Sequence, residues 1–353
     1  MAQPLKELVN AGSVQALAHG LAQVWPGFDA DAFVRRAAGP LPGLKLKERV
    51  RHVASALAGA PFLETAAALT EAARAVKLDL WSGWPATDYI AVHGLDHLRE
   101  SMAALAVLTP HATGEFAVRP FLDRHGPDAL AIMYDWALSP DEHLRRLASE
   151  GSRPRLPWAA RVPWLMSFGP TVPILSLLHD DPSAYVRRSV ANHVNDLAKD
   201  HPGQAVALLA AWREQGGSHV EQVLRHAVRG LLRAGDPQAL VLVGATPGAG
   251  SVRALDLASP SVAVGESLRF TVTLAADAPG PLVLRYAVRR DGSRRVFHLG
   301  ERTAESGGQS FTLSKAHSFR PVTTRSEPPG PRVLEVVVNG VTRASVPFTL
   351  TPA

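Results

Sequence analysis

The chain has 353 residues, of which 46% are hydrophobic and 20% charged, so it is long enough for two or three domains with large cores. It contains no cysteine, which excludes disulfide bonds and thiolate metal sites. Its formal charge of +5 resides in residues 251–353, which hold 13 basic and 8 acidic residues, so a polyanion site in the neutral residues 1–250 must be a local stripe.

The sequence shows no targeting or membrane signal. Its first residues, MAQPLKELVNAG, lack the basic and apolar regions of a secretory signal. No apolar run reaches the roughly 18 residues of a membrane span. We therefore expect a cytoplasmic protein without membrane contact. Because no coiled-coil pattern demands a dimer, we also expect a monomer.

Residues 1–245 are predicted to be helical throughout. Helix formers dominate, apolar residues recur at helical spacing, and proline and glycine separate segments of about 10–18 residues. These separators are Pro26-Gly27, Gly39-Pro40, Pro42-Gly43, Gly126-Pro127, Gly169-Pro170 and Asp236-Pro237.

A weak internal repeat runs through this helical part. Ser139-Pro140 leads into HLRRLASEG, Asp181-Pro182 leads into YVRRSVANHV, and VLRHAVRGLL repeats the theme, with a period of about 40 residues. This period is typical of stacked helix pairs of the HEAT type, which form a solenoid with a concave face. Arg146, Arg188 and Arg225 fall at corresponding positions, so they either form a basic ladder or are ordinary exposed arginines.

The composition changes after Gly244, where ATPGAGS indicates a linker and sets a domain boundary between residues 245 and 246. Alternating stretches follow, separated by turn signals that include Asp291-Gly292 and Asn339-Gly340. They are 267–274, 282–288, 295–299, 310–313, 333–338 and 344–350. About seven short strands in residues 246–353 favour a small all-β immunoglobulin-like sandwich. The piece 315–332 is expected to be an extended connection or loop.

The stretch Leu144–Leu165 is unusual because it combines five arginines and two tryptophans with a single acid, Glu150. Glu150 precedes a glycine at a helix C-terminus, where the helix dipole disfavours a carboxylate, so it either has a function or pairs with Arg146 four residues earlier. Trp158 is either solenoid core or a platform for a sugar or base.

Glu115 lies in TGEFAVRPFL, where Thr113 can cap a helix and place Glu115 in its first turn. A first-turn acid that only supports the helix is the simpler interpretation. The apolar neighbours and a following arginine indicate instead a partly buried helix start. Glu115 is therefore a second candidate for a functional carboxylate.

Other motifs are less informative. In YVRRSVANHVNDLAKDHP we expect Asn192, Asn195 and Asp196 to bond neighbouring helices, whereas Arg187 and Arg188 are candidate phosphate contacts. His93 and His97 have metal-ligand spacing, but the glutamate of a zinc-protease motif is missing, so structural histidines are favoured. The sequence has no phosphate-binding glycine loop and no serine nucleophile motif, and we expect no metal or other cofactor.

Three motifs together resemble the HEAT-like-repeat alkylpurine DNA glycosylases, and the AlkC branch more closely than AlkD. They are TGEFAVRPFL, HLRRLASEGSRPRLPW and YVRRSVANHVNDLAKDHP, in this order and spacing. The segment KAHSFRPVTTR resembles the immunoglobulin-like domain that one subgroup adds at the C-terminus.

The resemblance implies a base-excision repair enzyme that acts on double-stranded DNA and hydrolyses the N-glycosidic bond of cationic bases such as 3-methyladenine and 3-methylcytosine. It implies Glu115 as the catalytic carboxylate, with Glu150 as the second acid and Trp158 as the aromatic residue. It places the arginines of the second motif near the DNA backbone (Arg146, Arg153 and Arg155). We expect the C-terminal domain to grip DNA through Lys315, His317, Arg320 and Arg325.

The alternative is a non-catalytic HEAT-repeat scaffold that binds DNA or protein. The two interpretations differ in whether Glu115, Glu150 and Trp158 converge on one surface.

Overall fold

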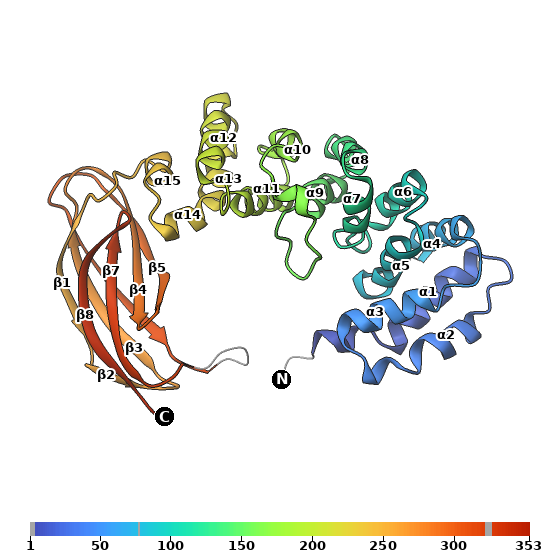
Figure 1. Cartoon of the computed structure of the whole chain (residues 1–353), viewed down its shortest axis with the longest axis horizontal. Helices are drawn as coiled ribbons and strands as arrows, with labels where there is room; N and C mark the ends of the chain where they lie inside the picture. The colour runs from blue at the N-terminus through green and yellow to red at the C-terminus, as the bar shows by residue number, and fades with distance from the viewer. Residues whose placement is uncertain (1–3, 77, 322–326) are drawn as a thin grey trace. The chain divides into compact units, whose positions relative to one another are not determined.

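The computed structural model describes residues 4–76, 78–321 and 327–353. Over these residues fifteen α-helices and three short 3-10 helices are followed by eight β-strands (Figure 1). This order confirms the expected fold class, a helical-repeat array followed by a β-sandwich. Within the described ranges, no helix is both long and apolar enough to cross a membrane.

The helices are η1 (Leu5–Leu8), α1 (Ala11–Val24), α2 (Ala30–Ala38), η2 (Leu41–Gly43), α3 (Leu46–Ser55), α4 (Phe62–Val76), α5 (Leu80–His93), α6 (Leu98–Leu108), α7 (Arg119–His125), α8 (Pro127–Ala137), α9 (Glu142–Gly151), η3 (Pro163–Met166), α10 (Val172–Leu178), α11 (Ala184–Leu197), α12 (Pro202–Gln215), α13 (Val220–Ala227), α14 (Arg229–Ala234) and α15 (Pro237–Leu242). The strands are β1 (Ser251–Leu257), β2 (Ser261–Ala263), β3 (Ser267–Ala275), β4 (Gly280–Arg290), β5 (Ser293–Ala304), β6 (Ser310–Ser318), β7 (Gly330–Val338) and β8 (Val341–Thr351).

The chain forms two compact units. One contains the residues up to Asp200 together with Gln215–Val223, and the other contains His201–Glu214 and Leu224–Ala353. Helices α14 and α15 therefore belong to the same unit as the strands. The boundary expected between residues 245 and 246 lies between α15 and β1, where helix gives way to strand, and as a domain boundary it remains a prediction.

Aspartate and asparagine side chains begin several helices, as their capping chemistry requires. Asn10 accepts hydrogen bonds from two backbone amides at the start of α1, and Asp79 does the same at α5. Asp141 caps α9 through the amide of His143. Of the separators expected from the sequence, Asp236-Pro237 coincides with such a start, because the Asp236 side chain accepts from the Ala239 amide at α15.

Tandem arginines join successive repeats in the first unit. In α9, Arg145 donates to the two backbone carbonyls that precede its helix and forms a 2.6 Å ion pair with Asp181. In α11, 42 residues later in the sequence, Arg187 donates to the two carbonyls before its own helix and to Gln222. The first arginine of each pair therefore stabilises the stack of helices. The weak repeat in the sequence thus corresponds to a repeat in the structure.

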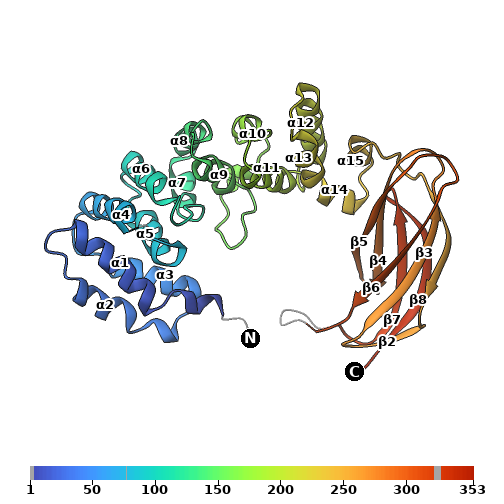
Figure 2. The ribbon, with the colours of Figure 1, turned by 180° about the vertical axis from the view of Figure 1, so that it is seen from behind.

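The second unit contains a two-sheet sandwich (Figure 2). One sheet has the order β1-β3-β6, and the other has the order β2-β8-β7-β4-β5. Neighbouring strands are antiparallel except for β2 and β8, which run parallel. Inward-facing residues of both sheets form one apolar core, with Phe270, Leu284 and Val336 among its buried members.

The Asn339-Gly340 turn joins β7 and β8, as expected for a hairpin of this type. Asn339 has a φ of 43° and Gly340 a φ of 82°, which matches the positive values that this turn requires. The Asn339 side chain accepts from the Val283 amide at 2.7 Å and donates to the Thr246 carbonyl at 2.9 Å. A Cβ on Gly340 would come within 2.8 Å of the Gly235 carbonyl, so glycine allows α14 to approach this turn.

Three local expectations were wrong. Strands β1 and β2 were not expected, because their residues carry few large apolar side chains. The piece 315–332 is not one loop: β6 continues to Ser318 and β7 begins at Gly330. Glu115 does not lie in the first turn of a regular helix, since α7 begins only at Arg119.

A fully buried histidine links neighbouring helices of the first unit. His193 lies in α11, with its Nδ1 atom 2.9 Å from the carbonyl of Ser149 in α9 and its Nε2 atom 3.1 Å from the hydroxyl of Thr171. A neutral ring meets both partners by donating from Nδ1 and accepting at Nε2. Burial lowers the pKa of His193 to about 3.

Acidification should therefore destabilise the first unit through His193. The pKa of His193 in the folded protein lies below the ordinary value of 6.5, so between these two values the unfolded chain binds a proton that the folded protein does not. The free energy of unfolding therefore falls as the pH drops from about 6.5 towards 3. The contribution is at most about 1.4 kcal/mol per pH unit. NMR of histidine-labelled protein, with His193→Gln for assignment, should show ring signals that do not titrate between about pH 8 and 5. A midpoint near 6.5 would contradict this.

Candidate active site

Glu115 lies in a single helical turn that precedes α7. The amide of Val118 donates to the carbonyl of Gly114 at 3.0 Å, which closes this turn. Thr113 accepts from the Glu115 amide at 3.4 Å, and its hydroxyl lies 3.2 Å from Oε2 of Glu115. Thr113 thus caps the turn, as expected, and holds one carboxylate oxygen.

Glu150 lies near the C-terminal end of α9 and is only 6% exposed. Its Oε2 atom accepts a 2.6 Å hydrogen bond from Ser189 of α11. Its Oε1 atom lies 2.7 Å from Nη1 of Arg153 and 3.7 Å from Nη2 of Arg146. The pairing with Arg146 considered from the sequence is present, but Arg153 is the closer partner.

Arg146 connects the two carboxylates. Its Nη1 atom lies 2.5 Å from Oε2 of Glu115 and donates to the Thr113 hydroxyl at 2.9 Å, while Nη2 faces Glu150. The ring of Tyr185 lies 5.1 Å from the guanidinium carbon, in cation–π contact. A single cation therefore offsets the repulsion between two glutamates that come from different helical segments.

Glu150 is fixed further by a second ion pair beneath it. Arg153 contacts Asp196 of α11 at 2.8 Å, and Asp196 also pairs with Lys199 at 3.2 Å. Burial opposes the charge of Arg153, but Glu150 and Asp196 together raise its pKa above the ordinary value. Asp196 thus bonds to the loop that follows the neighbouring helix α9, close to the helix end that was expected as its partner.

Glu115, Glu150 and Trp158 line one pocket of about 340 Å³. Its other walls are mostly apolar and aromatic, with Leu80, Trp81, Trp84, Thr113, Phe116, Arg153 and Leu156 among them. The two glutamates therefore lie at one concave and largely apolar surface. This is the arrangement of a small-molecule or nucleotide site rather than of two separate surface ion pairs.

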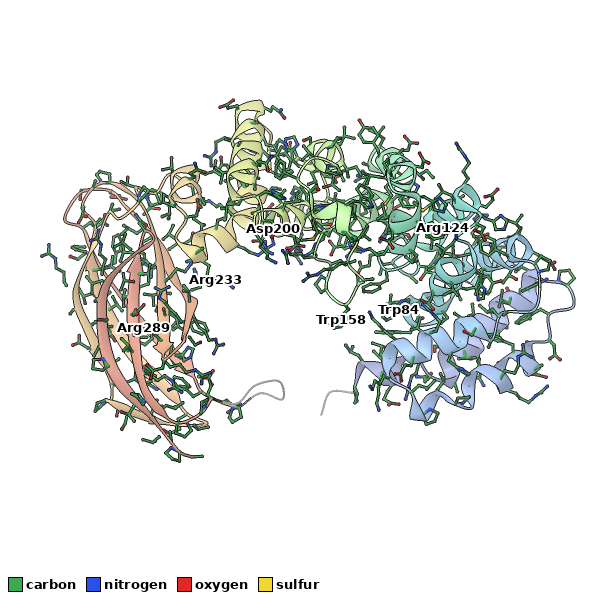
Figure 3. The ribbon with its side chains drawn as sticks, viewed as in Figure 1. Trp84, Arg124, Trp158, Asp200, Arg233 and Arg289 are labelled. Atoms are coloured by element: carbon green, nitrogen blue, oxygen red, sulfur yellow. The ribbon has the colours of Figure 1, made fainter. Side chains whose placement is uncertain are left out.

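Trp158 is presented to solvent by a loop without regular secondary structure. Its φ is 65°, a left-handed value that is uncommon for an aromatic residue, and it is 66% exposed. Trp84 of α5 stacks on Phe116 with ring centroids 5.6 Å apart. Figure 3 shows Trp158 on the loop after α9, near Trp84. Trp158 is thus an exposed aromatic residue and not solenoid core.

The arginines expected to meet DNA have different settings. Arg146 and Arg153 belong to the carboxylate cluster. Arg155 pairs with Asp200 at 2.8 Å and remains partly exposed. Arg187 is only 8% exposed and bonds backbone carbonyls, so its burial favours a structural role over the phosphate contact that the sequence suggested.

Arg188 and Arg225 are the remaining members of the expected ladder. Arg188 of α11 is exposed and forms no hydrogen bond or ion pair with the residues that the structure describes. Arg225 of α13 pairs with Glu301 of β5 at 3.5 Å and is half exposed. A continuous basic stripe through these arginines remains a prediction.

In the second unit, Lys315 is half-buried on β6 and Arg320 is exposed just after it. His317 is buried, 3.0 Å from the hydroxyl of Tyr286 and edge-on to Phe297, so it packs the sandwich instead of facing a ligand. Burial lowers the pKa of His317, which keeps this ring neutral. Arg325 lies outside the described residues.

The remaining motifs have structural settings. His93 packs against Tyr89, and His97 stacks on Phe62 with ring centroids 5.2 Å apart. In the described part of the chain, no group of three histidine, aspartate or glutamate side chains could hold a metal ion.

Several residues of the site were not expected. Phe116 follows Glu115 directly and could have been noticed, since an apolar residue beside a buried acid favours a pocket wall. The sequence around three further residues does not indicate a role in the site, because they reach it only through the packing of α3, α5 and α11. These residues are Lys47, Trp84 and Ser189.

Comparison with known proteins agrees with this architecture. Residues 251–352 match the family model described as "Uncharacterised protein YhaZ, C-terminal Ig-like domain". The uncharacterized protein YhaZ of Bacillus subtilis (strain 168) is 35% identical over 356 residues, covering 98% of each chain.

A solved structure matches the whole chain. It is the Pseudomonas fluorescens alkylpurine DNA glycosylase AlkC bound to DNA containing an abasic site analog. The TM-score is 0.90, the sequence identity is 34%, and the match covers 99% of each chain. The chain therefore belongs to the AlkC-type family of helical-repeat proteins that carry a C-terminal immunoglobulin-like domain, as do AlkC and YhaZ.

Proposed function

We propose that this protein is a DNA glycosylase that hydrolyses the N-glycosidic bond of cationic N-alkylated bases, such as 3-methyladenine and 3-methylcytosine, in double-stranded DNA. The observation that carries this proposal is the convergence of Glu115 and Glu150 on Arg146 in one aromatic-walled pocket. Carboxylates in separate surface ion pairs would instead have favoured a scaffold. The similarity to an alkylpurine DNA glycosylase supports the same conclusion.

The chemistry of the leaving base explains what such a site must do. A base alkylated at a ring nitrogen that had carried a lone pair, such as N3 of adenine or cytosine, is positively charged. It leaves with the electron pair of the glycosidic bond as a neutral molecule and needs no protonation. The sugar is left with oxocarbenium-like charge. A carboxylate that faces this charge and orients water for attack at C1′ lowers the barrier electrostatically.

The two carboxylates are suited to different parts of this task. Both oxygens of Glu150 have partners, Ser189 and Arg153, so this group is fixed. Glu115 contacts Arg146 and Thr113 through Oε2, and its Oε1 atom accepts no hydrogen bond from the described residues. We assign to Glu115 the role of facing the sugar and holding the attacking water, and to Glu150 the role of fixing Arg146.

Trp158 supplies an exposed aromatic face beside the same pocket. A cationic base is attracted to such a face by cation–π interaction, which an unmodified neutral base lacks. We propose that this attraction contributes to discrimination of the alkylated base.

Glu115→Gln should lower the single-turnover rate of base release by about 10²–10³-fold, because it removes the charge that stabilises the sugar. Binding to undamaged DNA should change little. The rate is measured as 3-methyladenine released from alkylated DNA and separated by chromatography. Glu100→Gln, on the exposed face of α6, is the control and should leave the rate unchanged. A Glu115→Gln enzyme that releases base at the wild-type rate would show that the assignment is wrong.

The C-terminal unit is proposed to hold DNA through Lys315, Arg320 and Arg325. Replacing Lys315 and Arg320 by alanine should weaken binding to double-stranded DNA. The slope of the logarithm of the binding constant against the logarithm of the salt concentration should become smaller by about one for each phosphate that the variant no longer neutralises. Arg302→Ala, on exposed β5 of the other sheet, is the matched control. The measurement is a binding titration between about 50 and 200 mM salt. Unchanged affinity and slope in the double variant would refute this contact surface.

A further inference from the structure

The loop between α9 and η3, residues 152–162, has no regular secondary structure. It carries Trp158, whose φ of 65° is an uncommon backbone conformation for an aromatic residue. Such a conformation persists only where the surroundings hold it. The backbone carbonyls of Gly151 and Arg153, two buried residues at the start of the loop, also need donors that a helix or sheet would otherwise provide.

Arg119, the first residue of α7, provides these donors. Its Nη1 atom donates to the carbonyls of Gly151 at 3.0 Å and of Arg153 at 2.6 Å. Its Nε and Nη2 atoms both donate to the carbonyl of Ala160, at 3.1 and 3.0 Å. The guanidinium of Arg119 therefore bonds residues near both ends of the loop, which lie before and after Trp158 in the sequence.

The setting of Arg119 is unusual for a charged side chain. It is 2% exposed, and no ion pair joins it to a carboxylate among the described residues. Burial lowers the pKa of Arg119 to about 10, so it stays protonated at neutral pH. Its guanidinium donates to the carbonyls of Gly151, Arg153 and Ala160, and Asp123 on the same helix favours its charge electrostatically.

A second cation holds the loop at Trp158 itself. Lys47 of α3 donates to the backbone carbonyl of Trp158, and its ammonium lies 5.2 Å from the centre of the Phe116 ring. Phe116 follows Glu115 in the sequence. Lys47 thus connects the aromatic platform to the segment that carries the first carboxylate.

We infer that Arg119, assisted by Lys47, is a positioning residue for base excision, which fixes Trp158 relative to Glu115. Glu115 lies one turn before Arg119 on the same segment, so the distance between the carboxylate and the platform is set by this clamp. The inference rests on the proposed function, because it assigns the clamp a role in excision beyond stability.

Arg119→Lys is the first test, since lysine keeps the charge but cannot donate to three carbonyls from a fixed plane. In the full chain labelled with 5-fluorotryptophan, the fluorine resonance of Trp158, assigned with Trp158→Phe, should shift or broaden. The single-turnover rate of 3-methyladenine release should fall by about tenfold or more, because misplacing a site group slows the chemical step. The dissociation constant for undamaged DNA should change by less than about threefold.

Arg124→Lys is the matched control on the same helix. Arg124 is half exposed and pairs with Asp96, so this change should leave both the Trp158 resonance and the rate unaltered. An Arg119→Lys protein that folds and keeps the wild-type Trp158 resonance and wild-type rate overturns the inference.

If Arg119→Lys does not fold, Lys47→Met decides the question, because Lys47 is exposed and donates to the loop at the Trp158 carbonyl. For Lys47→Met the inference predicts a displaced Trp158 resonance and a slower rate of base excision. Wild-type values for both measurements overturn it. If the wild-type protein itself releases no alkylated base, the proposed function fails. The fluorine spectra still report separately whether the two cations hold Trp158.

Discussion

The site depends on one interaction, the contact of the Arg146 guanidinium with two glutamates. Without this cation, Glu115 and Glu150 would face each other across a largely apolar pocket, where like charges repel strongly and desolvation is costly. With it, α9 can carry a carboxylate near its C-terminal end against the preference of the helix dipole. The burial of Glu150, the placement of Arg153 and the contact of Ser189 all follow from satisfying this cluster.

In the helical repeat two adjacent arginines have different roles, and the second arginine of one pair, Arg146, belongs to the glutamate cluster. Arg145 and Arg187 point back to the loop carbonyls before their helices and bind the next repeat, which is a stabilising role. The following residues, Arg146 and Arg188, point elsewhere: one meets the glutamates, and the other is exposed. The first position of each pair thus keeps the stack together, while the second is left for other contacts.

The sequence predicted the helical array, the sandwich, the Asn339-Gly340 hairpin and three residues that line the pocket, Glu115, Glu150 and Trp158, because helical spacing, turn chemistry and motif order are local signals. Contacts between distant segments could not be predicted: Glu115 and Arg146 meet only because a turn before α7 packs on α9. His317 shows a signal that was missed. Leu313 and His317 of β6 lie at even spacing and both face inward, as does Phe319 just after the strand, which is why His317 is buried.

A double-mutant cycle measures most directly whether the two carboxylates form one catalytic unit. Single-turnover rates of 3-methyladenine release would be compared for wild type, Glu115→Gln, Glu150→Gln and the double variant. If both groups act through Arg146, the rate reduction in the double variant should be clearly smaller than the product of the two single reductions. Reductions that multiply would mean that Glu115 and Glu150 act independently, and would contradict the shared site.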